Sequence, residues 1–297
     1  MKPPALIAVM GPTGSGKSAL AERIADVLDA QLLNADAFQV YRGFDIGTNK
    51  PDDRRRYRLL DLKDPHEDFG VGEWVGLAVA ELGRLWAAGR SAVVVGGTGL
   101  YVRALFEEWN DLAPPPDPAL RAEVRAWAED GVEALAARLV ALDPERAQAI
   151  DLANPARVIR ALERTLQPQP PVAFSLPPFR KLKWGLNPGV EILDERIGAR
   201  VVQMMRRGWM AEVVRLSAEG VRLQDPAMRA IGYRTLLRVL GGEIGLEKAL
   251  ELIRLETRQY AKRQRTWLRS EPHLQWFTVT DEEGLESKIQ EALERPE

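Results

Sequence analysis

A glycine-rich loop near the start of the chain has the residue types and spacing that bind phosphate groups. Residues 11–18 read Gly-Pro-Thr-Gly-Ser-Gly-Lys-Ser and fit the pattern G-x-x-x-x-G-K-[ST], between an apolar segment and a stretch of helical periodicity. Glycine permits positive φ, so the backbone N–H groups can turn inward beside a helix N-terminus. Lys17 adds a charge, and the Ser18 hydroxyl can bind Mg²⁺. The loop predicts a diphosphate or triphosphate site and specifies no nucleotide.

Asp36 is an acid in a position where it could act on such a ligand. It follows the short apolar segment 31–34, and ligands of a doubly wound sheet bind at the carboxyl ends of its strands. In a kinase with a phosphate loop, an acid near the loop holds Mg²⁺. The segment 92–95, from which that acid would be expected, leads instead into Gly96-Gly97-Thr98. Asp36 is therefore the acid that we expect to serve the site.

The elements that must position these residues alternate between strands and helices. Strands are predicted at 5–10, 31–34, 57–62, 92–95 and 181–186, and helices at 17–29 and 72–88. Such alternation is typical of βαβ units, so we expect an α/β fold: a P-loop NTPase-like parallel sheet flanked by helices.

A change of composition predicts a helical insertion within this sheet domain. Prolines at 114–116 and 118 mark its start, the sequence is then helical to about residue 166, and 167–178 is a Pro-rich return linker. We expect a catalytic core of residues 1–112 and 180–297, and a helical insertion of residues 113–179. The part after 186 is expected to be mostly helical.

Composition excludes several classes of protein. The 297 residues include no cysteine, which excludes disulfides, thiolate metal sites and a cysteine nucleophile. No run of 18 apolar residues is present, so we expect no membrane span and a cytoplasmic location. The two histidines, His66 and His273, lie in no motif. Because the net charge is −2, nucleic acid would have to be bound by a local basic face.

A basic stripe near the C-terminus could provide that face. Arg258, Lys262, Arg265 and Arg269 follow one another at steps of four, three and four, which places them on one side of a helix. Such stripes are usually solvated surface. Here the neighbouring polar and aromatic residues 264, 266 and 267 also suit RNA phosphates and a stacked base.

The order and spacing of these motifs resemble the bacterial tRNA dimethylallyltransferase family nearly from end to end. The matching segments, besides the phosphate loop, are 34–43, 45–48, 95–101, 142–144, 157–163, 196–200, 230–233 and 257–267. The chain departs from the family pattern at Ala37, where Ser is usual, at 152–155, where a His-Pro-Asn-Asp type sequence is common, and after Glu163, where the segment is shorter. The first two departures lie in regions that are expected to contact RNA.

The resemblance implies transfer of a dimethylallyl group from its diphosphate to the exocyclic amine of the adenosine 3′ of the anticodon, in tRNAs that read codons starting with U. That amine is a weak nucleophile and the leaving diphosphate is highly charged, so the reaction needs a base, cations and exclusion of water. The resemblance assigns catalysis to Asp36 as the base, Thr98 and Arg200. The alternatives are a Mg²⁺ ligand for Asp36, a helix N-cap for Thr98 and a solvated surface position for Arg200.

The resemblance also assigns binding residues and partners. The partners are the tRNA anticodon stem-loop, dimethylallyl diphosphate and Mg²⁺ on Ser18, and we expect a monomer. The diphosphate site comprises Gly11, Pro12, Thr13, Gly14, Ser15, Gly16, Lys17, Ser18 and Arg200. The tRNA site comprises Asp36, Ala37, Phe38, Gln39, Thr98, Arg121, Ala156, Arg157, Val158, Ile159, Arg160, Arg229, Ala230, Ile231, Gly232, Tyr233, Arg234, Lys262, Arg263, Gln264, Arg265, Thr266, Trp267, Leu268 and Arg269.

Two other functions are compatible with parts of the sequence. A kinase for a small metabolite or nucleoside would explain the loop, Asp36 and the sheet, but not the basic stripe and the insertion. A non-catalytic RNA-binding protein with a vestigial loop is disfavoured because the loop keeps both Lys17 and Ser18.

The basic stripe predicts salt-dependent tRNA binding. Replacing Lys262 and Arg265 together by Ala should weaken binding and flatten the slope of log affinity against log salt by about one to two units, because fewer counterions are released. Affinity measured at several salt concentrations for wild type and double variant checks this. Binding of prenyl diphosphate should be unchanged. Parallel lines with equal intercepts would mean that the stripe is solvated surface.

Overall fold

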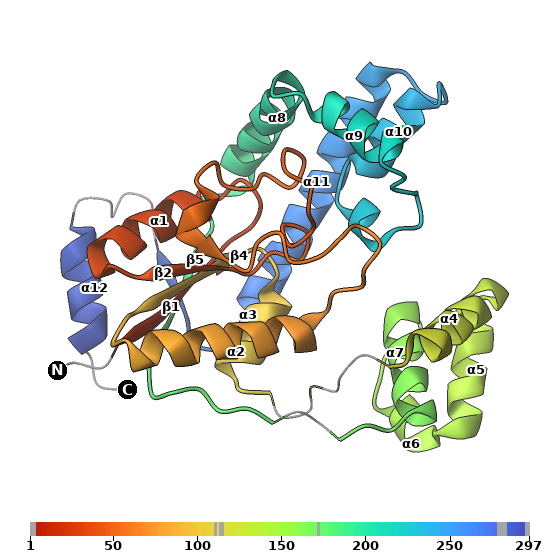
Figure 1. The fold of residues 1–297 in the computed structure, drawn as a ribbon, viewed down its shortest axis with the longest axis horizontal. Coiled ribbons are helices and arrows are strands. Elements are labelled where there is room, and N and C mark those ends of the chain that lie inside the picture. The colour runs from red at the N-terminus through yellow and green to blue at the C-terminus, as the bar shows by residue number, and fades with distance from the viewer. Residues whose placement is uncertain (1–3, 110–111, 113–115, 171–172, 278–283, 295–297) are drawn as a thin grey trace. The chain divides into compact units, whose positions relative to one another are not determined.

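A six-stranded parallel sheet forms the centre of the molecule in a computed structural model, which describes residues 4–109, 112, 116–170, 173–277 and 284–294 (Figure 1). The strand order is β3-β2-β4-β1-β5-β6. Every residue of β1 and β4 is buried, as expected for central strands of a parallel sheet covered on both faces. The strands are β1 (Ala5–Met10), β2 (Gln31–Asn34), β3 (Tyr57–Arg58), β4 (Ala92–Gly96), β5 (Arg180–Leu186) and β6 (Leu274–Phe277).

Helices connect and cover these strands. Four of them, α8 to α11, gather on one side of the core and pack against one another (Figure 1). The core helices are α1 (Lys17–Leu28), α2 (Val71–Ala87), α3 (Gly99–Phe106), α8 (Val190–Arg206), α9 (Trp209–Ala218), α10 (Tyr233–Leu240), α11 (Leu246–Arg269) and α12 (Leu285–Glu294), with short 3₁₀ turns η1 (Arg54–Arg56) and η3 (Pro226–Arg229). No helix in the described part of the chain is long and apolar enough to cross a membrane.

The chain divides into two compact units, of which residues 109–174 form the smaller. This helical unit has its own core, around Val124, Leu139 and Leu162. The predicted insertion, 113–179, therefore has both bounds slightly too far along the chain. The unit contains α4 (Pro118–Trp127), η2 (Ala128–Asp130), α5 (Val132–Leu142), α6 (Pro144–Gln148) and α7 (Pro155–Leu166).

Three helices of the small unit begin with the same local signal. Asp117, Asp143 and Asn154 are N-caps whose side chains accept backbone N–H groups of the first turn, and each is followed by proline. Proline fits the first helical position because its fixed φ suits the helix and because an N–H at that position would have no partner within the helix. The segment 152–155, where the chain departs from the family pattern, thus retains a strong helix start.

One strand was predicted too long, and another strand was not predicted. The segment predicted as a strand at 57–62 pairs only at β3, because Leu59 and Asp61 have φ of 65° and 53°, which breaks an extended chain. Conversely, β6 was not predicted. It is a four-residue edge strand with two exposed side chains, and so lacks the buried apolar run that identified the central strands.

Candidate active site

The glycine loop between β1 and α1 forms an anion cradle. Gly14 and Gly16 have φ of 88° and 91°, a region that suits glycine, and Gly16 is the N-cap of α1. The backbone N–H groups of Gly14, Gly16, Lys17 and Ser18 form no hydrogen bond with any described residue. These donors remain available to an anion at the helix N-terminus, as the sequence predicted.

Side chains from two distant helices hold this loop. Arg196 of α8 donates from Nη1 to the carbonyl of Gly14 at 3.2 Å. Gln264 of α11 accepts the N–H of Thr13 at 2.9 Å and donates to the carbonyl of Gly97 at 3.0 Å. The loop is therefore fixed by tertiary contacts that connect it to the turn after β4.

Two cations at the loop, Lys17 and Arg200, form no ion pair with an acid in the described part of the chain. The pKa of Lys17 is lowered to about 8, first by burial and then by the positive charge of Arg200, whereas Asp36 acts in the opposite direction. Burial also lowers the pKa of Arg200, a half-buried residue that forms no hydrogen bond or ion pair with another described residue. Two desolvated positive charges close together favour an anionic ligand.

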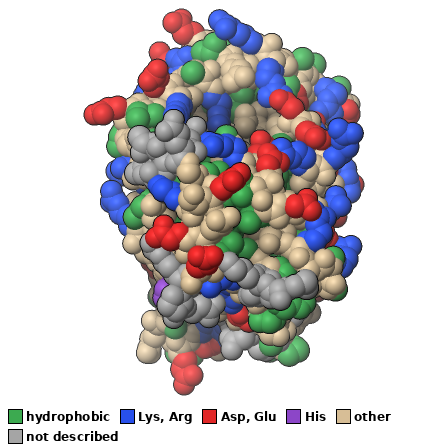
Figure 2. All heavy atoms as spheres, turned by 90° about the vertical axis from the view of Figure 1, so that its left-hand side faces the viewer, with side chains coloured by type: hydrophobic (Ala, Val, Ile, Leu, Met, Phe, Trp, Pro, Cys, Tyr) green, Lys and Arg blue, Asp and Glu red, His purple; other side chains and the backbone are tan. Residues whose placement is uncertain are grey.

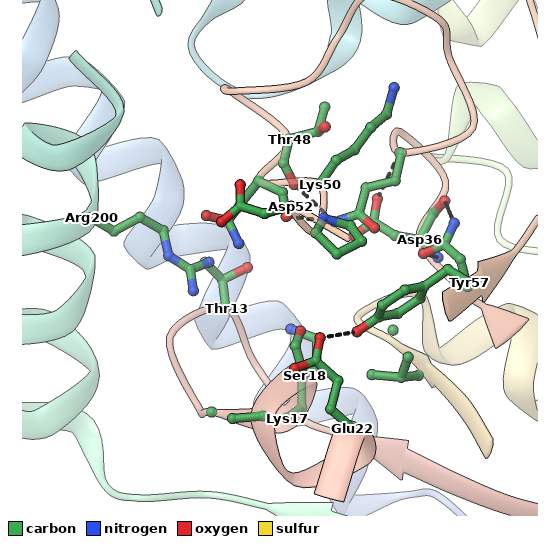
Figure 3. Close-up of a pocket in the computed structure, with 18 of the residues that line it drawn as sticks. Thr13, Lys17, Ser18, Glu22, Asp36, Thr48, Lys50, Asp52, Tyr57 and Arg200 are labelled. Atoms are coloured by element: carbon green, nitrogen blue, oxygen red, sulfur yellow. Dashed lines mark hydrogen bonds between the residues drawn. The ribbon is translucent and has the colours of Figure 1, made fainter. Parts of the chain in front are cut away.

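A polar cavity of about 420 Å³ opens in front of the loop. Arg200 extends towards Thr13 from one side, and Asp36 faces the cavity from the other (Figure 3). The cavity is lined by Thr13, Gly14, Gly16, Lys17, Ser18, Ala19, Glu22, Asn34, Asp36, Gln39, Thr48, Asn49, Lys50, Pro51, Asp52, Tyr57, Val95, Gly96, Arg200, Gln203 and Arg207.

The other cations that line this cavity are already neutralised. Lys50 bonds to Asp45 at 2.8 Å and to Asp61 at 2.5 Å, and Arg207 bonds to Asp52 at 2.7 Å. The positive charge available to a ligand therefore comes from the loop lysine and the arginine of α8.

A second cavity, of about 320 Å³, adjoins the first and is mainly apolar. The two share Thr13, Asp36, Thr48, Asn49 and Arg200, so they meet beside the carboxylate. The further lining residues of the apolar cavity are Phe38, Gly47, Ile197, Val201, Met204, Trp209, Arg229, Ala230, Ile231, Ile253, Thr257, Tyr260 and Arg263.

Asp36 keeps one carboxylate oxygen free at this junction. Its Oδ1 accepts the backbone N–H of Phe38 at 2.9 Å and that of Gln39 at 3.4 Å. Its own N–H donates to Asn34 Oδ1 at 3.2 Å. Oδ2 forms no hydrogen bond with a described residue, so a fixed carboxylate presents an open acceptor to the cavities.

Thr98 and Gln39 hold the segment that carries Asp36. Thr98 occupies the N-cap position of α3, but its hydroxyl caps no N–H of that helix; it accepts the N–H of Ala37 at 3.1 Å. Gln39 donates to the carbonyls of Thr48 and Asn49 at 3.0 and 3.1 Å. The alternative cap is not formed, and the observed bond orients the Asp36 loop; contact of Thr98 with substrate stays a prediction.

Several residues predicted to contact tRNA are buried in the core. Tyr233 is fully buried, accepts the N–H of Gly47 at 3.1 Å and donates to Glu212 at 2.6 Å. Burial raises its pKa well above the usual value. Gln264 and Leu268 are also buried, as are Ala230, Gly232 and Val158. They support the exposed residues beside them, and Ala230 also lines the apolar cavity.

The exposed part of the predicted tRNA site is basic. Arg229 and Arg234 are exposed near the start of α10, and exposed Lys262, Arg263, Thr266 and Arg269 lie on α11. Within the stripe, Arg258 pairs with Asp194 at 3.3 Å, and Arg265 is half-buried. Figure 2 shows basic and acidic side chains interspersed over one face of the molecule, in keeping with a net charge of −2.

Trp267 is less available for base stacking than the sequence suggested. Arg103 lies over its ring at 4.1 Å, and its indole N–H donates to Glu271 at 3.1 Å. Glu271 is buried and also bonds to Lys183 at 2.9 Å. The tryptophan therefore anchors the end of α11 to α3 and β5.

In the helical unit, the predicted tRNA residues divide between surface and ion pairs. Arg121 and Arg160 each bond to the buried carboxylate of Glu163, at 3.1 Å in both cases. Ala156 and Arg157 are exposed at the start of α7, and Ile159 is half-buried. A buried acid held by two arginines is costly to break, so these two arginines stabilise the unit whether or not they reach RNA.

Sequence reasoning missed the apolar cavity and Tyr260. Three apolar residues of α8 line this cavity, and they follow one another at steps of four and three: Ile197, Val201 and Met204. That helical spacing beside Arg200 could have identified them. Tyr260 lies inside a matched motif, and burial and the charge of Asp36 raise its pKa, whereas the charge of Arg263 lowers it. The polar residues Glu22 and Tyr57, which bond at 2.7 Å, carried no sequence signal.

The residues at the loop fit Mg²⁺ bound together with a phosphate ligand. Ser18 lies at the start of α1 and lines the polar cavity with Glu22 and Asp36. No group of three or more His, Cys, Asp or Glu side chains in the described ranges could hold a metal alone. That combination suits Mg²⁺, which usually binds one or two protein oxygens plus waters and substrate phosphates.

The parallel sheet, the phosphate loop and the adjoining apolar cavity define an α/β enzyme that binds an anionic group beside an apolar one. A family model described as IPP transferase matches residues 39–271. The tRNA dimethylallyltransferase of Thermomicrobium roseum is 38% identical over 98% of this chain and 91% of its own. tRNA dimethylallyltransferase 1 of Trichlorobacter lovleyi is 40% identical over 95% of each chain.

A solved structure agrees with these relatives. The full-length tRNA isopentenylpyrophosphate transferase of Bacillus halodurans has a TM-score of 0.71 and 34% identity, and the match covers 98% of this chain and 97% of that one. The chain belongs to the tRNA dimethylallyltransferase family.

The lowered pKa of Lys17 predicts that diphosphate binding depends on pH. Lys17 loses its charge as pH rises through about 8, so inorganic diphosphate should bind tightly below that pH and about tenfold more weakly at pH 9 than at pH 7. Calorimetric titration at both values checks this. Lys17→Ala should bind more weakly at pH 7 and lose the dependence. An equal fall in the variant would assign the titration to another group.

Proposed function

We propose that this chain transfers a dimethylallyl group from dimethylallyl diphosphate to the exocyclic amine of the adenosine 3′ of the anticodon, in tRNAs that read codons starting with U. The products are N6-isopentenyladenosine and diphosphate. The observation that carries the proposal is the open oxygen of Asp36, which lies where a polar, cation-lined cavity meets an apolar one.

The polar cavity suits the diphosphate. The free N–H groups of Gly14, Gly16, Lys17 and Ser18 and the charges of Lys17 and Arg200 face the place where negative charge grows as the leaving group departs. Fixed donors and cations stabilise such charge without reorganisation. Mg²⁺ bound through Ser18 would neutralise further charge on the diphosphate.

The apolar cavity suits the uncharged parts of the reactants, the prenyl chain and the purine ring. Its lining includes Phe38, Trp209 and Ile253, which exclude water from the allylic carbon. An adenosine in an anticodon loop would have to leave its stack to enter, as enzymes that modify bases require.

Asp36 would move the proton. The amine nitrogen attacks the first carbon of the prenyl group, the bond from that carbon to the diphosphate oxygen breaks, and the diphosphate leaves with the electron pair. The amine proton passes to Oδ2 of Asp36, while Oδ1 stays bonded to Phe38 and Gln39.

Exposed cations provide a surface for tRNA phosphates. Arg229 and Arg263 line the apolar cavity and are exposed, and Lys262 and Arg269 lie on the same helix as Arg263. RNA phosphates held there would bring a displaced base to the cavity mouth. We propose that the chain acts on tRNA in the cytoplasm, as a monomer.

The kinase alternative is not favoured. The relatives that match over nearly the whole chain are named as dimethylallyltransferases. The direct test incubates the protein with dimethylallyl diphosphate, Mg²⁺ and unmodified tRNA, without ATP. Mass analysis of digested tRNA should show the gain of one prenyl group. Absence of that gain, with ATP consumed in the presence of a metabolite panel, would support the kinase.

Substitution of the base should slow the reaction without weakening tRNA binding. Asp36→Asn keeps the acceptor for the N–H of Phe38 but removes the basic oxygen, so we expect turnover to fall by about a hundredfold or more. Single-turnover rates and tRNA affinity are the measurements. Asp52→Asn, a carboxylate of the same cavity paired with Arg207, is the matched control and should stay near wild type. Near-normal turnover of Asp36→Asn would remove it from the base role.

A further inference from the structure

Gln264 is a buried polar residue of α11 whose amide touches both loops of the active site. It is 7% exposed, accepts the N–H of Thr13 at 2.9 Å and donates to the carbonyl of Gly97 at 3.0 Å. Neither the proposed chemistry nor RNA binding uses this side chain. Its effect is on the phosphate loop itself.

The first consequence concerns the donors of the loop. The N–H of Thr13 is occupied by Gln264 and that of Ser15 by the carbonyl of Pro12, at 3.0 Å. The free N–H groups are therefore confined to Gly14 and to the helix end of the loop, from Gly16 to Ser18. A ligand that extended to Thr13 would have to displace a buried amide that is bonded at both ends.

The second consequence concerns space. A Cβ added to Gly97 would lie 2.2 Å from Gln264 Nε2 and 3.9 Å from Lys17 Cε. The amide therefore lies directly against Gly97, and only glycine at position 97 permits so close an approach. A side chain at position 97 would displace Gln264 and with it the bond to Thr13.

The third consequence concerns charge. The unpaired cations of the polar cavity in the described residues are Lys17 and Arg200, and the carboxylates of Asp36 and Glu22 line the same space. Two positive charges suit a diphosphate. A triphosphate carries more negative charge and would place it nearer to these carboxylates.

We propose that Gln264 is a specificity-determining residue that closes the outer end of the phosphate loop, so that the loop accepts a diphosphate and rejects a triphosphate. The inference rests on the proposed function in taking the donor to be a diphosphate. It explains how a loop with the pattern of nucleotide-binding proteins is restricted by a residue about 250 positions away in the sequence.

The test compares inorganic diphosphate with inorganic triphosphate, each with Mg²⁺, by calorimetric titration. Wild type should bind diphosphate at least about tenfold more tightly. Gln264→Ala frees the Thr13 N–H, so the preference should fall by about tenfold, mainly through tighter triphosphate binding. Gln259→Ala, an exposed glutamine of the same helix, is the matched control and should keep the wild-type ratio.

A purely structural role for Gln264 predicts a different result. If its bonds only tie α11 to the loop, both ligands should weaken in parallel and the ratio should stay unchanged, which would overturn the proposal. Gln264→Asn, too short to bridge Thr13 and Gly97, tests the same point in a variant that stays polar. A changed ratio without prenyl transfer would support the role of Gln264 and count against the proposed function, whereas prenyl transfer with an unchanged ratio would overturn only the role of Gln264.

Discussion

The rest of the site depends on two desolvated positive charges that form no ion pair with an acid among the described residues. Lys17 lies at the start of α1 and Arg200 on α8, and burial lowers the pKa of each. Holding such charges near one another costs free energy, which an anionic ligand recovers. Lys50, another cation of the cavity, is paired with two aspartates, so Lys17 and Arg200 are left for the ligand. Gln264 holds the loop that carries Lys17 and its free N–H groups.

The carboxylate opposite these charges is positioned by a series of contacts that reaches far from the site. Glu212 of α9 accepts the N–H groups of residues 45–47, Gln39 bonds to the following carbonyls, and Thr98 bonds to Ala37 beside Asp36. A loop secured at several points can keep Oδ2 free in a fixed direction. Catalytic groups need that precision, because small displacements of a base cost large factors in rate.

Motifs that looked like RNA contacts turn out to combine two tasks. In 229–234 and 262–269, buried residues such as Tyr233, Gln264 and Leu268 lie among exposed arginine and lysine. Tyr233 and Gln264 bond to loops of the site, and the exposed Arg229 and Arg263 line the apolar cavity. The proposed function therefore places the cations for tRNA and the residues that fix the active site on the same helix, α11, where Arg263 directly precedes Gln264.

Interactions between residues that are close in the sequence account for the local features of the fold. The loop 11–18, the buried strands β1 and β4 and the Asx-Pro helix starts follow from glycine φ, apolar runs and capping, all of which depend on near neighbours. The edge strand β6 and the broken strand after β3 were missed because tertiary contacts decide them. Only the fold showed that Gln264 meets Thr13 and that Thr98 holds Ala37, since such pairings depend on which distant segments meet, a property that neither periodicity nor composition encodes.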